Sequence, residues 1–165
     1  MRSLKWSISH AVFVAEIDDE HKEIFEALSN VQEALGGAPA QIRTPMQRLV
    51  TAMVDHFAHE ERLMRAARYT GMRWHKKQHE NARKRVEQFV RRIGKGDAKA
   101  GPALVEYLSS WLGDHARLSD RMMGASLRNH KRGLFKMTFR AGTKPMDACA
   151  WVDANGDRFD PSSPR

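Results

Sequence analysis

The sequence predicts an all-α fold, an antiparallel up-down four-helix bundle with an N-terminal arm and a C-terminal extension. Three observations lead to this prediction. Four segments repeat apolar residues at spacings of three and four, the period of an amphipathic helix. Gly or Pro separates each pair of segments, as in bundles with short connections. The length of 165 residues suits one domain with a modest appendix, and we expect the bundle to occupy residues 1–124.

The chain is expected to begin with an ordered arm that leads into the first helix. Residues 1–16 contain enough apolar side chains to lie against the bundle, but their pattern does not predict a helix. The first helix is expected at about 18–35. Asp18 or Asp19 can cap its beginning, and Gly36-Gly37 ends it.

The second helix is expected at about 44–68 and the third at about 72–93. Thr44 is a natural N-cap for the second helix, because Pro45 then takes the first helical position, where its missing N–H costs nothing. Gly94 follows the third helix and indicates its end.

The fourth helix is expected at about 103–127, and the composition then changes. Residues 125–165 scatter aromatic side chains among Gly, Pro and charged residues, so we expect a separate basic extension. Within it, Asn155-Gly156 stands between the short pairs at 151–152 and 158–159. This arrangement is typical of a type I′ turn and predicts a small β-hairpin.

The composition excludes several classes of protein. The chain has 41% hydrophobic residues but no apolar run near the roughly 18 residues that a membrane helix needs, so we expect no membrane insertion. The N-terminus has no long apolar stretch before a small-residue cleavage site, which predicts a cytoplasmic protein. Cys149 is the only cysteine, so thiolate metal sites are excluded and a bound metal must take nitrogen and oxygen ligands.

The charge distribution suggests an acidic partner. The formal net charge is +8, and eleven Lys or Arg lie between Arg62 and Arg92 against only Glu80 and Glu87. Such a stripe can contact nucleic acid or an anionic membrane surface, although a solvated helix face is the simpler interpretation. The extension from Ala125 adds eight basic and four acidic residues, and it is a candidate for docking a protein partner.

The histidines are spaced for metal binding. Residues four apart on a helix share a face, and the second and third helices each carry such a pair. Five imidazoles and two carboxylates exceed what one tetrahedral zinc ion uses, and the mixed set suits two ions of iron or manganese. Five residues would turn the last carboxylate about 140° away on a regular helix, so it needs side-chain reach or a locally widened helix. Spacing alone does not select that carboxylate, which rests on the resemblance described next. The candidate ligands are His21, His56, Glu60, His75, His79, His115 and Asp120.

Four segments that carry these residues resemble the signatures of hemerythrins. The segments are IDDEHK at 17–22, HFAHEERLM at 56–64, HKKQH at 75–79 after Tyr69, and WLGDH at 111–115 followed by the carboxylate at 120. All seven ligand positions match in order over roughly residues 1–124. A single pair of histidines would be weak support, whereas the full set is specific.

The resemblance implies a non-heme di-iron site. One iron would be bound by His75, His79 and His115, and the other by His21 and His56. The resemblance further implies that both ions share two carboxylates and a solvent-derived oxo or hydroxo bridge, and that the second iron keeps an open position for dioxygen. The implied bridging residues are Glu60 and Asp120, and the implied walls of the oxygen pocket are Ile24, Trp111 and Leu112.

The function that this resemblance implies is reversible dioxygen binding for storage, delivery or sensing, without turnover. A second hypothesis keeps the di-iron centre but makes it an oxidoreductase acting on peroxide, nitric oxide or ferrous iron. Ala116 replaces the larger aliphatic residue common after the last histidine, and it would let water approach. A third hypothesis is an oxygen-responsive basic adaptor that binds nucleic acid or a protein partner. His59, one turn after His56, is a candidate partner for that ligand.

Overall fold

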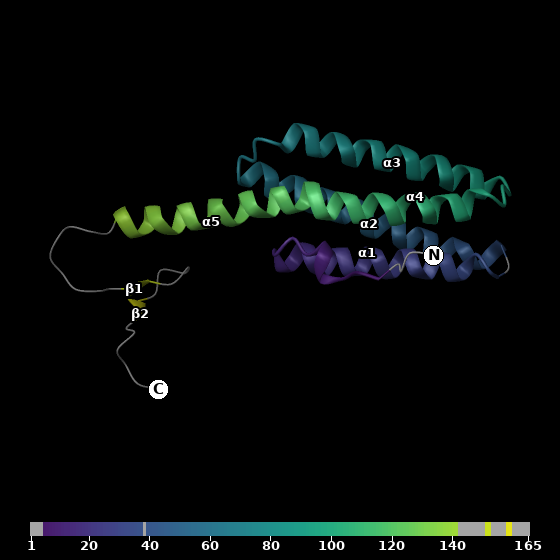
Figure 1. Ribbon diagram of the computed structural model, residues 1–165, viewed down its shortest axis with the longest axis horizontal. Helices are drawn as coiled ribbons and strands as arrows, with labels where there is room; N and C mark the ends of the chain where they lie inside the picture. Colours follow the sequence, from purple (N-terminus) through teal and green to yellow (C-terminus); the bar gives the residue numbers. More distant parts are fainter. Residues whose placement is uncertain (1–4, 38, 142–150, 153–157, 160–165) are drawn as a thin grey trace. The chain divides into compact units, whose positions relative to one another are not determined.

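The computed structural model confirms the all-α four-helix bundle (Figure 1). It describes residues 5–37, 39–141, 151–152 and 158–159, with side chains described for 5–37 and 41–133. Successive helices run in opposite directions, and the last of the four rods is built from two α-helices joined end to end. The helices are α1 (Ala15–Ala34), α2 (Arg43–Ala66), α3 (Met72–Gly94), α4 (Ala100–His115) and α5 (Arg121–Ala141).

The helix beginnings differ from the expected caps. A 3-10 turn, η2 (Pro39–Ile42), leads directly into α2, so this helix starts at Arg43 and no side chain caps it. The expected N-cap at Thr44 is therefore wrong, and Pro45 still fits because the first-turn N–H groups have no partner within the helix. The expected cap at Asp18 or Asp19 is wrong for a similar reason, since α1 already begins at Ala15.

The fourth rod is longer than the sequence predicted. Residues Ala116–Asp120 form one π-helical turn, η3, between α4 and α5, and α5 continues to Ala141. The expected end near Leu127 is wrong because the change of composition after Ala125 does not bring in residues that stop the helix. No proline interrupts 121–141, and most of its residues are good helix formers.

The N-terminal arm is tied to the bundle by hydrogen bonds to its backbone. It contains a 3-10 turn, η1 (Ile8–His10), although no helix was expected there. Asp18 accepts the N–H groups of Val12 and Phe13 at 2.7 and 3.0 Å, so its carboxylate orders the arm. Arg121 donates to the Ser9 carbonyl at 3.1 Å. The arm therefore packs where the π turn passes into α5.

Two apolar clusters fill the bundle, and a layer of polar residues lies between them. In α1, Ile17 belongs to the smaller cluster and Ile24 to the larger, with buried His21 between them. In α3, two buried histidines lie between Met72 of the smaller cluster and Ala82 of the larger. Each fully buried Leu, Ile or Phe contributes roughly 1.5–3 kcal/mol to stability, so these clusters hold the polar layer in place.

Contacts divide the chain into two units, residues 1–130 and 131–165. In the second unit, β1 (Trp151–Val152) pairs antiparallel with β2 (Arg158–Phe159), Trp151 facing Phe159. The expected turn at Asn155-Gly156 lies outside the described residues, and the expected boundary at residue 124 stays a prediction. Among the described residues, no helix combines the length and apolar character needed to cross a membrane.

Candidate metal centre

The structure brings all seven predicted ligand residues together inside the bundle. Each rod supplies at least one of them, and all seven are buried. They form two overlapping groups, and within each group the candidate ligand atoms lie within 4.8 Å of one another. One group is Glu60, His75, His79, His115 and Asp120, and the other is His21, His56, Glu60 and Asp120.

The carboxylate of Asp120 lies among three imidazoles. Its Oδ1 is 3.0 Å from Nε2 of His75 and 3.0 Å from Nε2 of His115. Its Oδ2 is 3.2 Å from Nε2 of His21. The two oxygens thus face histidines from different groups, which is the arrangement expected of a bridging carboxylate.

Glu60 occupies the corresponding place on α2. Its Oε2 lies 3.1 Å from Nε2 of His79, 3.4 Å from Nε2 of His75 and 3.7 Å from Nε2 of His56. The first two histidines belong to one group and the third to the other. Two carboxylates are therefore shared, and every imidazole turns its Nε2 toward them.

The buried carboxylates fit a cation. Neither oxygen of Glu60 and neither oxygen of Asp120 has a hydrogen-bond partner of good geometry among the described residues. Burying ionised oxygens without such partners is costly, and a bound cation removes the cost. Imidazole nitrogens with carboxylate oxygens suit iron or manganese, and the donor set fits two ions. Their roles as ligands remain a prediction.

The π turn explains how Asp120 reaches this centre. In a regular α-helix, a residue five positions after His115 would point about 140° away from it. The turn Ala116–Asp120 follows π geometry, with hydrogen bonds from residue i to i+5, which returns Asp120 to the side of His115. The sequence left two alternatives, a reaching side chain or a locally widened helix, and the structure shows the widened helix.

The electrostatics of the metal-free centre favour ionised carboxylates beside protonated His56 and His75, whereas burial lowers the pKa of His79. Burial and the Asp120 carboxylate raise the pKa of Glu60, but His56 and contacts from His75 and His79 outweigh them and lower it to about 2. Burial lowers the pKa of His75, but the carboxylates of Asp120 and Glu60 reverse this and raise it to about 9. A metal ion must displace these protons, so its binding is linked to pH.

Glu20 orients one of the histidines from outside the cluster. The Nδ1 atom of His56 donates to Glu20 Oε2 at 2.9 Å, which leaves Nε2 facing the centre. The other oxygen of Glu20 accepts from Nδ1 of His59 at 2.5 Å. His59 therefore supports His56 through this carboxylate and not by direct contact. Hydrogen bonds of this kind fix the tautomer and the ring orientation of a ligating histidine.

Gln78 has the same role on the opposite side. Its Oε1 accepts from Nδ1 of His115 at 3.1 Å and from Oγ of Ser119 at 3.0 Å. Because Ser119 lies within the π turn, one amide oxygen fixes both a candidate ligand and the backbone that presents Asp120. The His79 Nδ1 atom lies 3.5 Å from Glu61 Oε1, a longer contact of the same kind.

Aromatic rings cover two of the imidazoles. Phe57 stacks on His79 with ring centroids 4.0 Å apart and an interplanar angle of 9°. Trp111 stacks on His115 at 4.3 Å and 16°, and its edge meets Phe57 at 5.8 Å. The predicted pocket residues Ile24 and Leu112 are buried in the same cluster as Phe57, and Trp111 packs against it. Their contact with dioxygen remains a prediction.

Three supporting residues were not identified from the sequence. Glu20, Gln78 and Phe57 each act on a histidine of a different helix, so no spacing within one segment reveals them. The sequence predicted Phe57 only as an apolar core residue, because it fits the helical repeat of α2. For Glu20, the only indication in the sequence was its position beside the candidate ligand His21.

A buried nitrogen and carboxylate centre in a four-helix bundle defines a class of metal-binding proteins, and comparison with known sequences identifies the family. The model of the hemerythrin HHE cation-binding domain matches residues 12–127. The chain belongs to the hemerythrin family.

Individual relatives agree with this assignment. The chain is 34% identical over 160 residues to a bacteriohemerythrin of Pseudomonas aeruginosa, a match covering 96% of this chain and 99% of the relative. It is 28% identical over 115 residues to myohemerythrin-1 of Phascolopsis gouldii and 31% identical over 115 residues to a hemerythrin of Siphonosoma cumanense, each match covering 70% of this chain. These matches cover 87% of the Phascolopsis gouldii protein and 86% of the Siphonosoma cumanense protein. The bacterial match also includes most residues beyond 124.

Proposed function

We propose that this protein binds dioxygen reversibly at a non-heme di-iron centre, for storage, delivery or sensing. The observation that carries the proposal is the pair of overlapping ligand groups with Glu60 and Asp120 in common. One group offers three histidines and the other offers two, so the two metal positions are unequal. An ion held by fewer protein ligands retains room for a small molecule.

The iron pair, when bound, supplies the two electrons that dioxygen takes up and returns. The protein holds the ions and controls their surroundings. His75, His79 and His115 would hold one ion, and His21 and His56 would hold the other. Glu20 and Gln78 keep two of these rings in orientation by accepting hydrogen bonds from their Nδ1–H groups. The carboxylates neutralise part of the positive charge that would otherwise build up in a buried site.

Exclusion of water is the second task of the chain. Ile24, Leu112 and Phe57 are buried, and Trp111 lies flat on His115. We infer that these apolar side chains keep solvent from the open metal position, because water and protons would displace the bound dioxygen in its reduced form and prevent its return. Apolar walls of this kind favour reversible binding over turnover.

The other hypotheses have less support. Ala116 is buried and lines none of the surface hollows found among the described residues, so the expected approach of water at Ala116 has no support. Two of these hollows do reach a candidate ligand, one at His56 and one at His115, and the matched experiment below tests whether they permit turnover. The expected docking of a protein partner would use the extension, and most of its side chains, from 134 onward, lie outside the described residues. The cytoplasmic location remains a prediction.

The direct test is an anaerobic titration followed by visible absorption. We expect the reduced, iron-loaded protein to develop a charge-transfer band when oxygen is admitted and to lose it under argon, over repeated cycles. A matched experiment adds peroxide or nitric oxide and follows its consumption. Catalytic consumption with no reversible oxygen band would reject the proposal in favour of an oxidoreductase.

A further inference from the structure

Two helices that lie diagonally opposite each other in the bundle, α1 and α3, carry opposite net charge. Helix α1 carries seven Asp or Glu and a single Lys, whereas α3 carries eight Lys or Arg and two Glu. Both pack against α2 and α4, so they present opposite sides of the bundle to solvent. The α3 side of the bundle is therefore strongly basic, whereas the α1 side is acidic. Such a distribution orients the protein toward an acidic partner.

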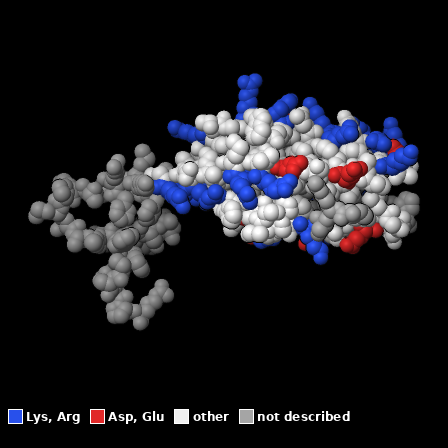
Figure 2. All heavy atoms as spheres, in the orientation of Figure 1, with Lys and Arg blue, Asp and Glu red and all other residues white. Residues whose placement is uncertain are grey.

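Five cations of α3 and its C-cap form a straight row that we call the cationic ridge. At 3.6 residues per turn, all five fall within an arc of roughly 40° around the helix axis, and they extend over about 33 Å. Figure 2 shows Lys and Arg side chains projecting from the upper edge of the bundle, where Figure 1 places α3. The cationic ridge consists of Arg73, Lys77, Lys84, Arg91 and Lys95.

The cationic ridge is exposed and mostly unpaired. All five side chains are exposed to solvent. Lys77 forms an ion pair with Glu80 at 3.1 Å, whereas the other four have no ion pair with the described residues. Arg85 and Arg92 flank the row, and Arg92 is paired with Asp97. Unpaired like charges in a row repel one another. Binding of a polyanion relieves this repulsion and releases counterions, so binding is favourable.

We propose that the cationic ridge is a docking surface for the phosphate backbone of double-helical nucleic acid. Duplex DNA presents one negative charge about every 1.7 Å and has a major groove about 12 Å wide, which admits a helix of roughly 10–12 Å diameter. The convex crest of α3 can enter such a groove, and its long Lys and Arg side chains can reach the phosphates along the edges of the groove. We expect the long cationic side chains of the row to contact phosphates, and such contacts bind without reading the base sequence.

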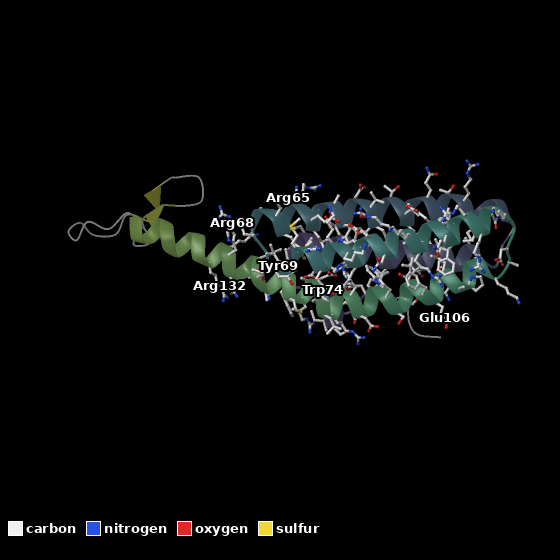
Figure 3. The ribbon with its side chains drawn as sticks, turned by 90° about the horizontal axis from the view of Figure 1, so that it is seen from above. Arg65, Arg68, Tyr69, Trp74, Glu106 and Arg132 are labelled. Atoms are coloured by element: carbon white, nitrogen blue, oxygen red, sulfur yellow. The ribbon has the colours of Figure 1, made fainter. Side chains whose placement is uncertain are left out.

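A membrane surface fits this ridge less well. Anionic membranes bind helices that also insert apolar side chains, and these face the core in α3. Trp74, labelled in Figure 3, is 54% exposed at the first turn, and Val90 is the other exposed large apolar residue of this helix. Two such side chains at separate positions do not form an insertion face. On a flat surface, only the crest of a convex ridge would reach the headgroups.

The experiment measures binding of the full-length, iron-loaded protein to a fluorescently labelled 20-base-pair duplex by anisotropy, at several salt concentrations. A dissociation constant of about 10⁻⁴–10⁻⁶ M at physiological salt is expected for such sequence-independent binding. The variant K84Q/R91Q/K95Q should bind at least about tenfold more weakly, and its slope of log K against log salt should be shallower by roughly 2–3.

A matched variant separates the ridge from net charge. K5Q/R43Q/R48Q removes the same number of exposed cations away from α3 and should keep the salt slope of the parent. Equal losses of duplex affinity in both variants would overturn the proposal. Unchanged affinity in the ridge variant would also overturn it and would assign binding to the C-terminal extension. Binding to phosphatidylglycerol vesicles or to a polyglutamate peptide but not to duplex would also overturn it. Circular dichroism and iron content check the fold of each variant.

Discussion

Asp120 lies five residues after His115 in the chain, yet its Oδ1 lies 3.0 Å from His115 Nε2. A regular helix would place the two side chains on different faces, and the π turn from Ala116 to Asp120 puts them on the same one. The fourth rod therefore contributes both a nitrogen and a shared oxygen to the centre. Single π turns within α-helices are frequent at functional sites.

The first prediction concerns this shared carboxylate. D120N keeps the shape of the side chain but removes the charge that faces His21, His75 and His115. We expect iron per chain, measured by plasma emission, to fall by at least about half, because both metal positions lose an anionic ligand. D114N is the control, since Asp114 is exposed and paired with Arg117. Full iron content in D120N would show that this carboxylate does not bridge.

The second prediction concerns the support of His56 by Glu20. E20Q removes the charge that accepts from His56 and His59, and we expect iron affinity to fall by roughly 10–100-fold in a chelator competition. E23Q changes an exposed carboxylate one turn away on α1 and should leave the affinity unchanged. Equal behaviour of the two variants would contradict a positioning role for Glu20.

The third prediction separates stability from protection of the centre. Phe57 stacks on His79, whereas Phe89 is buried in the same apolar cluster with no described contact to a histidine. F57A and F89A should each lower the free energy of unfolding by about 3–5 kcal/mol. Only F57A should also speed autoxidation, since it opens space beside a ligand. Similar autoxidation in both variants would contradict this role for Phe57.

The fourth prediction concerns pH. The folded, metal-free protein raises the pKa of His75 from 6.5 to about 9 through Asp120 and Glu60, which outweigh burial. This contribution to stability is complete below pH 6.5 and is lost as the pH rises through 9. The Tm of the metal-free protein should therefore fall by several degrees over that range. H75Q should show a smaller fall, and an equal fall in both proteins would exclude His75 as its source.

The fifth prediction tests the contact between the arm and α5. A Cβ atom on Gly124 would lie 2.7 Å from the Val12 carbonyl oxygen, so G124A requires the arm to move. We expect a loss of about 1–3 kcal/mol in the free energy of unfolding, measured by urea titration. A Cβ on Gly133 meets nothing within 4 Å, so G133A should be neutral or stabilising by up to about 1 kcal/mol. Stabilisation in G124A would contradict the close packing.

The bundle could be predicted from the sequence because its signals are local. Apolar residues repeat along each helix, and the connecting glycines and prolines interrupt the repeat, so the limits of α3 were placed within one residue. The pairing of His75 with His79 and of His56 with Glu60 follows from the same geometry, because residues four apart must share a face.

Other features depend on contacts between distant segments. The arm holds α1 from outside, so Asp18 orders the arm and does not cap the helix. Contacts between helices place Glu20 against His56 and Gln78 against His115, and no periodicity encodes such pairs. The sequence required a widened helix before Asp120 or a reaching side chain, and only the structure distinguishes these.

The central claim is that two metal ions share Glu60 and Asp120, and an anomalous difference map at the iron edge from crystals of the iron-loaded protein tests it most directly. We predict two peaks, one bounded by His75, His79 and His115 and the other by His21 and His56, with both carboxylates between them. A single peak, or density away from these side chains, would contradict the account.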